Sequence, residues 1–212
     1  MTITSIRAAL AVGLSALVLT GCDALRVITH ETTLDPARLE AGNYEIDPTH
    51  VSVVFKVDHF GFSNYVGRFN DARAALDYNA ADPAASSLAV AIGTASVDSR
   101  NDLIDAQLRG PAFFDAENHP EATFISSGIV MTGGNSGQVT GDLTVLGRSM
   151  PVTLDVTFNG GGKNPLTQVE TLGFSATGTF DRSDIGLGAW IPAVGDAVTL
   201  DIEVEFVKRA EP

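Results

Sequence analysis

"VTLDIEVEF", residues 198–206, is the clearest of several segments in which apolar and polar side chains alternate. Its valine, leucine, isoleucine and phenylalanine side chains share one side of an extended chain, and its threonine and acidic side chains share the other. Successive side chains of a β-strand point to opposite faces. The segment therefore predicts an antiparallel strand with one buried face and one face in water.

The same period of two residues recurs between Gly42 and Lys208. It predicts about eight or nine strands, among them segments near residues 44–59, 65–79, 87–98, 121–131, 139–145, 152–158, 172–180 and 198–206. Turns are expected at residues 133–137 and 146–149, with a longer glycine-rich loop at residues 160–165. A single all-β domain of this kind is either a sandwich or a closed barrel, and the periodicity does not choose between them.

One short helix is expected between the strands. Ser99 is its predicted N-cap, with Gly110 and Pro111 as its stop. Its apolar residues are expected to pack on the end of the sheet; they are Leu103, Ile104 and Leu108.

The histidines do not have the spacing of a metal site. His50 and His59 lie on one predicted strand, but their odd separation places them on opposite faces. Neither His30, in the polar N-terminal segment, nor His119, in a turn, adds a ligand by spacing. We therefore expect no metal.

Catalytic motifs are also missing from the sequence. There is no Gly-x-Ser-x-Gly nucleophile elbow, and most acidic residues fall on the wet faces of strands. We expect no enzyme and no catalytic residues. An enzyme that acts on lipid, with His59 as a catalytic residue, is a less favoured alternative.

The candidate functional residues are apolar and aromatic. Some continue the dry face of the strand at 44–59, and the others are aromatic residues further along the chain. The set is Val53, Phe55, Val57, His59, Phe69, Phe113, Phe114 and Phe124. These side chains either fill a packed core or line a tube for a long hydrocarbon, and the pattern alone leaves both interpretations open.

Charge excludes one class of partner. The chain has 13 basic and 26 acidic residues, for a formal charge of −13. Such a surface repels phosphate backbones, so nucleic acid is not an expected partner.

The first residues resemble a bacterial lipoprotein signal. An uncharged stretch from Ala8 to Leu19, too short to form a stable membrane-spanning helix, ends in Leu19-Thr20-Gly21-Cys22, which resembles a lipobox. We expect residues 1–21 to be removed as a signal peptide, Cys22 to carry the lipid attachment, and residues 22–41 to form a flexible tether. An ordinary secretory signal is the alternative. The anchor implies a periplasmic protein held on the inner or outer bacterial membrane.

Several motifs stand in a specific order along the remaining chain. They are Tyr44-Glu-Ile-Asp-Pro-Thr-His50, Val53-Val-Phe55-Lys-Val57-Asp-His59, Val66-Gly67-Arg-Phe69, Arg109-Gly-Pro-Ala-Phe113-Phe114-Asp115, His119-Pro120-Glu-Ala-Thr123-Phe124 and Val139-Thr-Gly141-Asp-Leu143-Thr-Val-Leu-Gly147. In this order they resemble the YceI-like family of bacterial periplasmic proteins, over about residues 42–208. The chain departs from that family at Asn101 and Gln107, where the family often has Asp and His.

The resemblance implies an eight-stranded antiparallel, lipocalin-like barrel with one short helix. It also implies a long-chain isoprenoid lipid as ligand, either an isoprenoid quinone or a polyprenyl lipid, held in the interior by the aromatic and apolar residues named above. No cofactor is required. The expected function is sequestration or transport of that lipid; the alternative is a structural or stress-response lipoprotein whose barrel is filled by its own side chains.

Overall fold

The computed structural model describes residues 26–210, which contain one sheet of ten strands and a few short helical segments. The strands are β1 Gly42–His59, β2 Ser63–Phe69, β3 Ala72–Tyr78, β4 Ser87–Gly93, β5 Val97–Asp98, β6 Glu121–Met131, β7 Ser136–Val145, β8 Arg148–Lys163, β9 Glu170–Asp181 and β10 Val194–Lys208. From Pro36 onward, the helical elements are the α-helix α2 Asp102–Arg109 and the 3-10 turns η1 Pro36–Arg38, η2 Pro83–Ala85, η3 Thr94–Ser96 and η4 Arg182–Ile185. None of the helices within residues 26–210 has the length and apolar character needed to cross a membrane. Cys22 and the apolar stretch before it lie outside the described residues.

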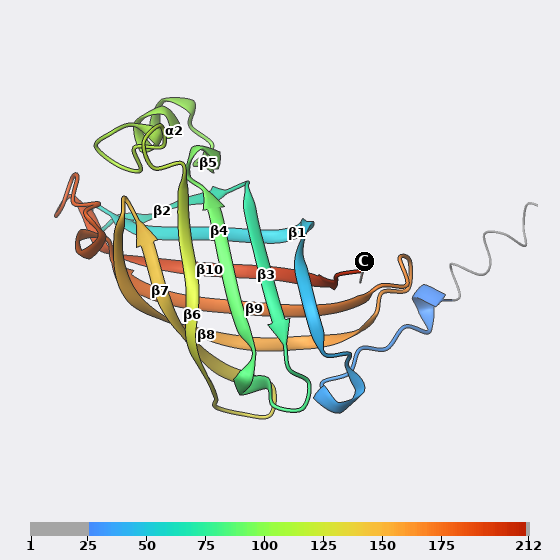
Figure 1. Ribbon diagram of the computed structural model, residues 1–212. Helices are drawn as coiled ribbons and strands as arrows, with labels where there is room; N and C mark the ends of the chain where they lie inside the picture. The colour runs from blue at the N-terminus through green and yellow to red at the C-terminus, as the bar shows by residue number, and fades with distance from the viewer. Residues whose placement is uncertain (1–25, 211–212) are drawn as a thin grey trace, which may run out of the picture.

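The sheet closes on itself because β10 pairs with β1 (Figure 1). The strands β2 and β3 both pair with the same edge of β1, first along residues 53–59 and then along residues 42–45. In the same way β5 pairs with β2, and β4 pairs with β3. The pairs β2–β3 and β4–β5 are therefore two bent strands, and the wall is the predicted eight-stranded antiparallel barrel.

The two bends lie side by side and hold each other in place. The hydroxyl of Ser96 accepts hydrogen bonds from the backbone N–H groups of Asn70 and Asp71, at 3.1 and 3.0 Å. A Cβ at Gly93 would stand 2.5 Å from the carboxylate of Asp71, so a larger residue at this crossing would have to displace that side chain. Beyond the bends, residues 99–120 with α2 lie over the end of the barrel (Figure 1). The sequence pattern predicted both bent strands as continuous and did not reveal these interruptions.

Buried side chains gather in three apolar clusters. One lies where the N-terminal segment meets the barrel, one near the opposite end, and one on the wall between them. Their buried members are Leu39, Tyr44, Leu76, Tyr78, Leu172 and Phe206; Ala122, Val145, Ile185 and Leu187; and Phe124, Val139, Val152 and Leu154.

Residues 198–206 of the strand β10 show how the interior differs from a solid core. The two outer dry-face residues, Val198 and Phe206, are buried. The three between them, Leu200, Ile202 and Val204, remain partly accessible although they also point inward, because they border an internal cavity.

The helix α2 exists as predicted, but its N-cap prediction was wrong. Asn101, not Ser99, caps it, by accepting hydrogen bonds from the backbone N–H groups of Leu103 and Ile104 at 3.1 and 3.4 Å. The prediction that Leu103 packs on the barrel was also wrong, since that side chain points to solvent, whereas Ile104 and Leu108 face the cavity.

The sequence predicted a glycine-rich loop at residues 160–165. In the structure, residues 160–163 instead continue the strand β8. Gly161 exchanges two backbone hydrogen bonds with Thr33, at 2.9 and 3.0 Å. A Cβ there would stand 2.7 Å from both Leu39 and Leu172, so glycine lets these two side chains close over the strand.

The segment after Thr33 packs against the barrel. Leu39 is buried in a core cluster, and the hydroxyl of Tyr44 donates a hydrogen bond of 2.5 Å to the carbonyl of Glu40. Leu34 and Pro36 border the cavity at this end of the barrel. The second half of the predicted tether therefore forms part of the wall around the barrel opening, which sequence pattern did not indicate.

Candidate ligand-binding site

The barrel encloses two apolar chambers. The larger, about 690 Å³, lies under α2, and the smaller, about 250 Å³, lies toward the N-terminal segment. We call them the upper and lower chambers. The same four side chains border both and form a waist between them: Val53, Ile92, Leu143 and Leu200. Both volumes are of the order found in small-molecule sites, and together they make an elongated apolar space.

All eight candidate residues from the sequence analysis border this space. Six line the upper chamber, one belongs to the waist, and one lines the lower chamber. They are, in that order, Phe55, Val57, His59, Phe69, Phe113 and Phe114; Val53; and Phe124. The two-residue period of β1 explains the first group, because its inward positions are the odd-numbered ones. Their role in holding a ligand stays a prediction.

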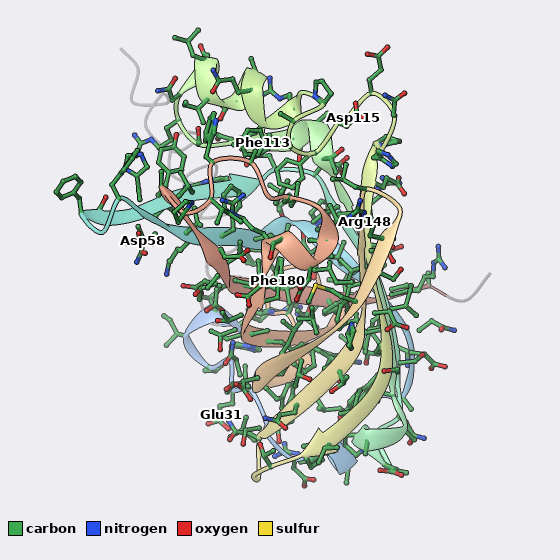
Figure 2. The ribbon with its side chains drawn as sticks, turned by 90° about the vertical axis from the view of Figure 1, so that its left-hand side faces the viewer. Glu31, Asp58, Phe113, Asp115, Arg148 and Phe180 are labelled. Atoms are coloured by element: carbon green, nitrogen blue, oxygen red, sulfur yellow. The ribbon has the colours of Figure 1, made fainter. Side chains whose placement is uncertain are left out.

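Aromatic rings form one side of the upper chamber. Phe55 and Phe69 lie 5.6 Å apart between ring centroids, and Phe69 and Phe114 lie 5.3 Å apart. Phe180, from β9, lies further inside the barrel than Phe113 (Figure 2). The lining offers polarizable apolar surface along the chamber, which suits an unsaturated hydrocarbon.

The inward positions of β10 that line the chambers run from Val198 to Phe206. At the rise of a β-strand this run measures roughly 27 Å. The space is therefore suited to a long, narrow molecule lying along the strands.

Polar side chains meet the upper chamber only at its outer end, among the described residues. They are His59, Tyr65 and Arg182. The hydroxyl of Tyr65 donates to Ser99 Oγ at 3.0 Å, and Ser99 donates to Asp105 Oδ1 at 2.6 Å. The side chain of Asp105 also accepts the backbone N–H of Ser99, at 2.8 Å, and is buried. This chain of hydrogen bonds fixes α2 over the chamber.

Arg182 organises the other segment at this end. It is buried and donates only to backbone carbonyls: Gly195 at 2.8 Å, Ala189 at 2.9 Å, Val194 at 3.0 Å, and also Leu187. Burial lowers the pKa of its guanidinium, although the group keeps its charge at any ordinary pH. Because four carbonyls converge on one side chain, residues 187–195 are held as a rigid loop over the chamber.

The two segments meet above the upper chamber. The ring of Phe113 contacts that of Trp190, with 4.7 Å between centroids in an edge-to-face arrangement. Sequence reasoning missed Asp105, Arg182 and Trp190. The burial of Asp105 and Arg182 and the ring contact of Trp190 depend on segments that meet only in the folded chain, so the sequence carried no signal for them.

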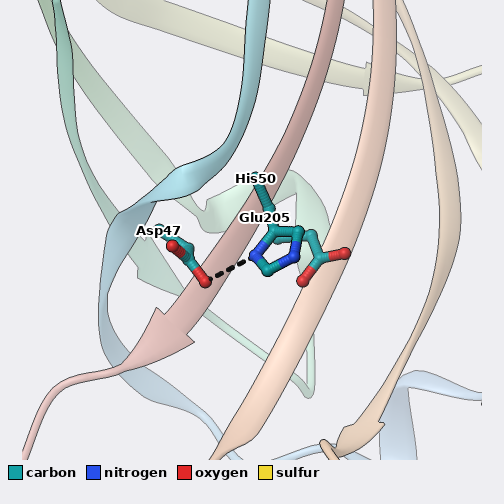
Figure 3. A group of neighbouring side chains, drawn as sticks. All are labelled: Asp47, His50 and Glu205. Atoms are coloured by element: carbon teal, nitrogen blue, oxygen red, sulfur yellow. Dashed lines mark hydrogen bonds and ion pairs between the residues drawn. The ribbon is translucent and has the colours of Figure 1, made fainter.

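Asp47, His50 and Glu205 form a polar group on the wall of the barrel (Figure 3). None of the three lines either chamber. Four residues of β1, 47–50, bulge opposite Glu205 of β10, which brings Asp47 and His50 beside that carboxylate. His50 Nδ1 lies 2.9 Å from Asp47 Oδ2, and the other oxygen of Asp47 accepts from the backbone N–H and hydroxyl of Thr49. The hydroxyl of Thr49, followed by His50, lowers the pKa of Asp47 to about 2.

The same contacts act on the histidine. The hydrogen bond to Asp47, followed by the charge of Glu205, raises the pKa of His50 above its ordinary value. Both carboxylate oxygens of Asp47 make hydrogen bonds to other residues of the bulge, and these bonds stabilise its conformation. The sequence missed this group, because the bulge brings together residues that a regular strand would separate.

Sequence comparison gives the relatives of this chain. A UPF0312 protein of Pseudomonas putida is 37% identical over 178 residues, covering 83% of this chain and 92% of the relative. Residues 44–206 match the model of the YceI-like domain.

Solved structures share the fold. BcnA of Burkholderia cenocepacia superposes with a TM-score of 0.69 at 29% identity, covering 76% of this chain and 98% of BcnA. A polyisoprenoid-binding domain from Saccharophagus degradans superposes with a TM-score of 0.54 at 14% identity, covering 80% of this chain and all of that domain (100%). With a matching family model over most of the barrel and a close relative over most of its length, this chain belongs to the YceI-like family.

Proposed function

We propose that this protein binds a long-chain polyisoprenoid, such as an isoprenoid quinone or a polyprenyl lipid, inside its barrel. The observation that carries the proposal is the elongated apolar space, in which inward side chains remain partly accessible instead of packing against one another. Removing a hydrocarbon chain from water gains about 0.8 kcal/mol per methylene equivalent, before the cost of ordering the chain. Apolar contact with the chamber walls is therefore sufficient to hold such a hydrocarbon chain, and no charged pair inside the site is needed.

The position of the polar groups supports the same ligand class. His59 and Tyr65 stand at the outer end of the upper chamber, where a quinone ring or a terminal oxygen would meet them. The polyisoprenoid-binding domain of Saccharophagus degradans has the same fold, which agrees with the proposal. We infer a binding protein rather than an enzyme, since these groups lie at one end of a hydrocarbon site and not around a reacting bond.

The proposed function also requires that the protein work close to a membrane. We infer that Cys22 is acylated and that the protein sequesters or transports its ligand in the periplasm from a membrane anchor. A lipid anchor suits this task, because the ligand resides in membranes and does not dissolve in water.

A matched pair of variants tests binding. Leu200→Trp fills the waist, whereas Thr199→Trp places the same side chain on the exposed face of the neighbouring position. Both proteins are offered a labelled polyprenol in detergent, and the retained label is measured after gel filtration. We expect the Thr199 variant to retain label like the parent chain and the Leu200 variant to lose most of it.

Equal retention by both variants would contradict binding through the barrel. Absence of retention in the parent chain itself would favour the alternative, a structural or stress-response lipoprotein with no ligand.

A further inference from the structure

The outer end of the upper chamber carries exposed apolar side chains on three separate segments. We call this set the rim: Phe60, Phe62, Leu103, Trp190 and Ile191. Phe62, at the tip of the β1–β2 hairpin, is 90% exposed, and Leu103 on α2 is 78% exposed. The hairpin that carries Asp58 projects away from the barrel (Figure 2).

The rim is continuous with the interior. Phe60, Trp190 and Ile191 are exposed and also line the upper chamber. The ring of Phe60 contacts that of His59, at 4.6 Å between centroids, and Trp190 contacts Phe113. Apolar surface therefore runs without a break from the chamber to the outside.

Three of the segments that border this opening carry no charged side chain. Residues 60–67, 110–114 and 185–195 contain no Asp, Glu, Lys or Arg, in a chain whose formal charge is −13. Each of the three segments contributes side chains to the upper chamber. The helix α2, which carries Leu103, differs, because it contains Asp102, Asp105 and Arg109. The acidic chain thus places three uncharged segments where the apolar space opens.

We propose that the rim inserts into the interfacial layer of a lipid bilayer and places the upper chamber against the hydrocarbon. The inference rests on the proposed function, since it supplies a route by which a water-insoluble ligand enters and leaves. Aromatic and leucine side chains partition favourably into this layer, and tryptophan is enriched there. A projecting hairpin tip suits a deformable lipid surface better than a groove on another protein. The acidic remainder of the surface favours zwitterionic over anionic lipid.

Trp190 makes the inference directly measurable, because it is the only tryptophan of the chain. The full chain is reconstituted with phosphatidylcholine vesicles, with or without bromine atoms on the acyl chains, and Trp190 fluorescence is recorded. An anchor at the N-terminus alone does not bring Trp190 into contact with the acyl chains, so quenching by brominated acyl chains reports contact between the rim and the bilayer. We expect clear quenching, together with a blue shift of the emission.

The double variant Phe62→Ser/Leu103→Ser tests the rim without touching the chamber, since neither side chain lines it. The control is Val130→Ser/Leu166→Ser, which removes two comparably exposed side chains elsewhere on the surface. The rim variant loses the burial of two large apolar groups, so its contact with the bilayer should weaken roughly tenfold or more. The control should be quenched like the parent chain.

The inference fails if Trp190 of the parent chain is not quenched, or if the rim variant is quenched as strongly as the control. Polyprenol retention is measured on the same proteins to separate this result from the proposed function. Retention without quenching would leave the ligand site standing and overturn the docking. Quenching without retention would support the docking and overturn the proposed ligand.

Discussion

The ring of Phe55 lies across the backbone of Gly67, its cross-strand partner on β2. A Cβ built at Gly67 would stand 2.3 Å from Cζ of Phe55. Glycine at this position lets a large ring lie along the wall, so the upper chamber stays open beside it. The pair therefore links a backbone requirement to the volume of the proposed site.

Gly67→Ala should push the Phe55 ring toward the chamber. We expect a loss of roughly 1–3 kcal/mol in the free energy of unfolding, as for other overpacked sites, and weaker polyprenol retention. Gly128→Ala is the matched control, since no atom lies within 4 Å of a Cβ at that position. Denaturant unfolding and gel-filtration retention check both variants, and an unchanged Gly67→Ala protein would mean that the ring has free room to move.

Phe55→Ala distinguishes a lined cavity from a solid core. Leu172→Ala is the core control, since Leu172 is fully buried and lines neither chamber. Truncating a leucine in a packed core costs roughly 2–5 kcal/mol, and truncating a phenylalanine there costs roughly 3–5 kcal/mol. Phe55 borders space that is already open. Its truncation should therefore cost less stability than that of Leu172 but should weaken isoprenoid retention. Destabilisation of Phe55→Ala as large as that of Leu172→Ala would show that Phe55 belongs to the core.

Arg182→Lys tests the loop that closes over the upper chamber. Lysine keeps the charge but cannot place donors on four separate backbone carbonyls as the guanidinium does. We expect a loss of roughly 1–3 kcal/mol in stability, because buried carbonyls lose partners. Faster amide hydrogen exchange should be confined to residues 187–195. Uniform exchange across the barrel would indicate a global effect instead.

The hydrogen bond between Asp47 and His50 in the bulge of β1 should make the pKa of each group depend on the other. The raised pKa of His50 means that protonated histidine stabilises the fold, with the full contribution below its unfolded pKa near 6.5 and a loss as pH rises through the folded pKa. Asp47, with its pKa lowered to about 2, contributes above its unfolded value and loses that contribution as pH falls toward about 2. In an NMR titration, Asp47→Asn should lower the pKa of His50. An unchanged histidine titration would contradict the contact.

Cys22→Ser tests the anchor. Without acylation the protein should move largely to the soluble fraction of cells, because contact of the rim with lipid is reversible. Its thermal unfolding should match that of the acylated protein, since the first strand of the barrel begins at Gly42, twenty residues after Cys22 in the sequence. A variant that pellets with membranes as completely as the parent chain would contradict anchoring through this cysteine.

Strand positions and faces were accessible from sequence because they depend on local alternation. The pattern of residues 198–206 and the inward phase of Phe55 both agree with the structure. A packed core and a lined cavity require the same alternation, however. Val53 and Leu172 both read as dry-face residues, yet Val53 borders the waist, whereas Leu172 is fully buried and lines neither chamber. The difference depends on the diameter at which the barrel closes, which no single strand encodes.

Features that depend on contacts between distant segments were not predictable in the same way. The N-cap was misplaced by two positions because Ser99 is a good cap by type, but its hydroxyl is used by Asp105. Arg182 looked like one surface cation among many until the carbonyls of residues 187–195 converged on it. The bulge at residues 47–50 was hidden because a strand pattern does not show which partner residues face it.

The content of the barrel is the most direct test of the central claim. The protein is purified from its native host without added lipid, extracted with organic solvent and examined by mass spectrometry, with the Leu200→Trp variant prepared in parallel. The account predicts an isoprenoid quinone or polyprenyl lipid in the extract of the parent chain at close to one molecule per barrel, and its loss from the variant. Reproducible absence of isoprenoid from the parent chain, or equal amounts in both proteins, would contradict it.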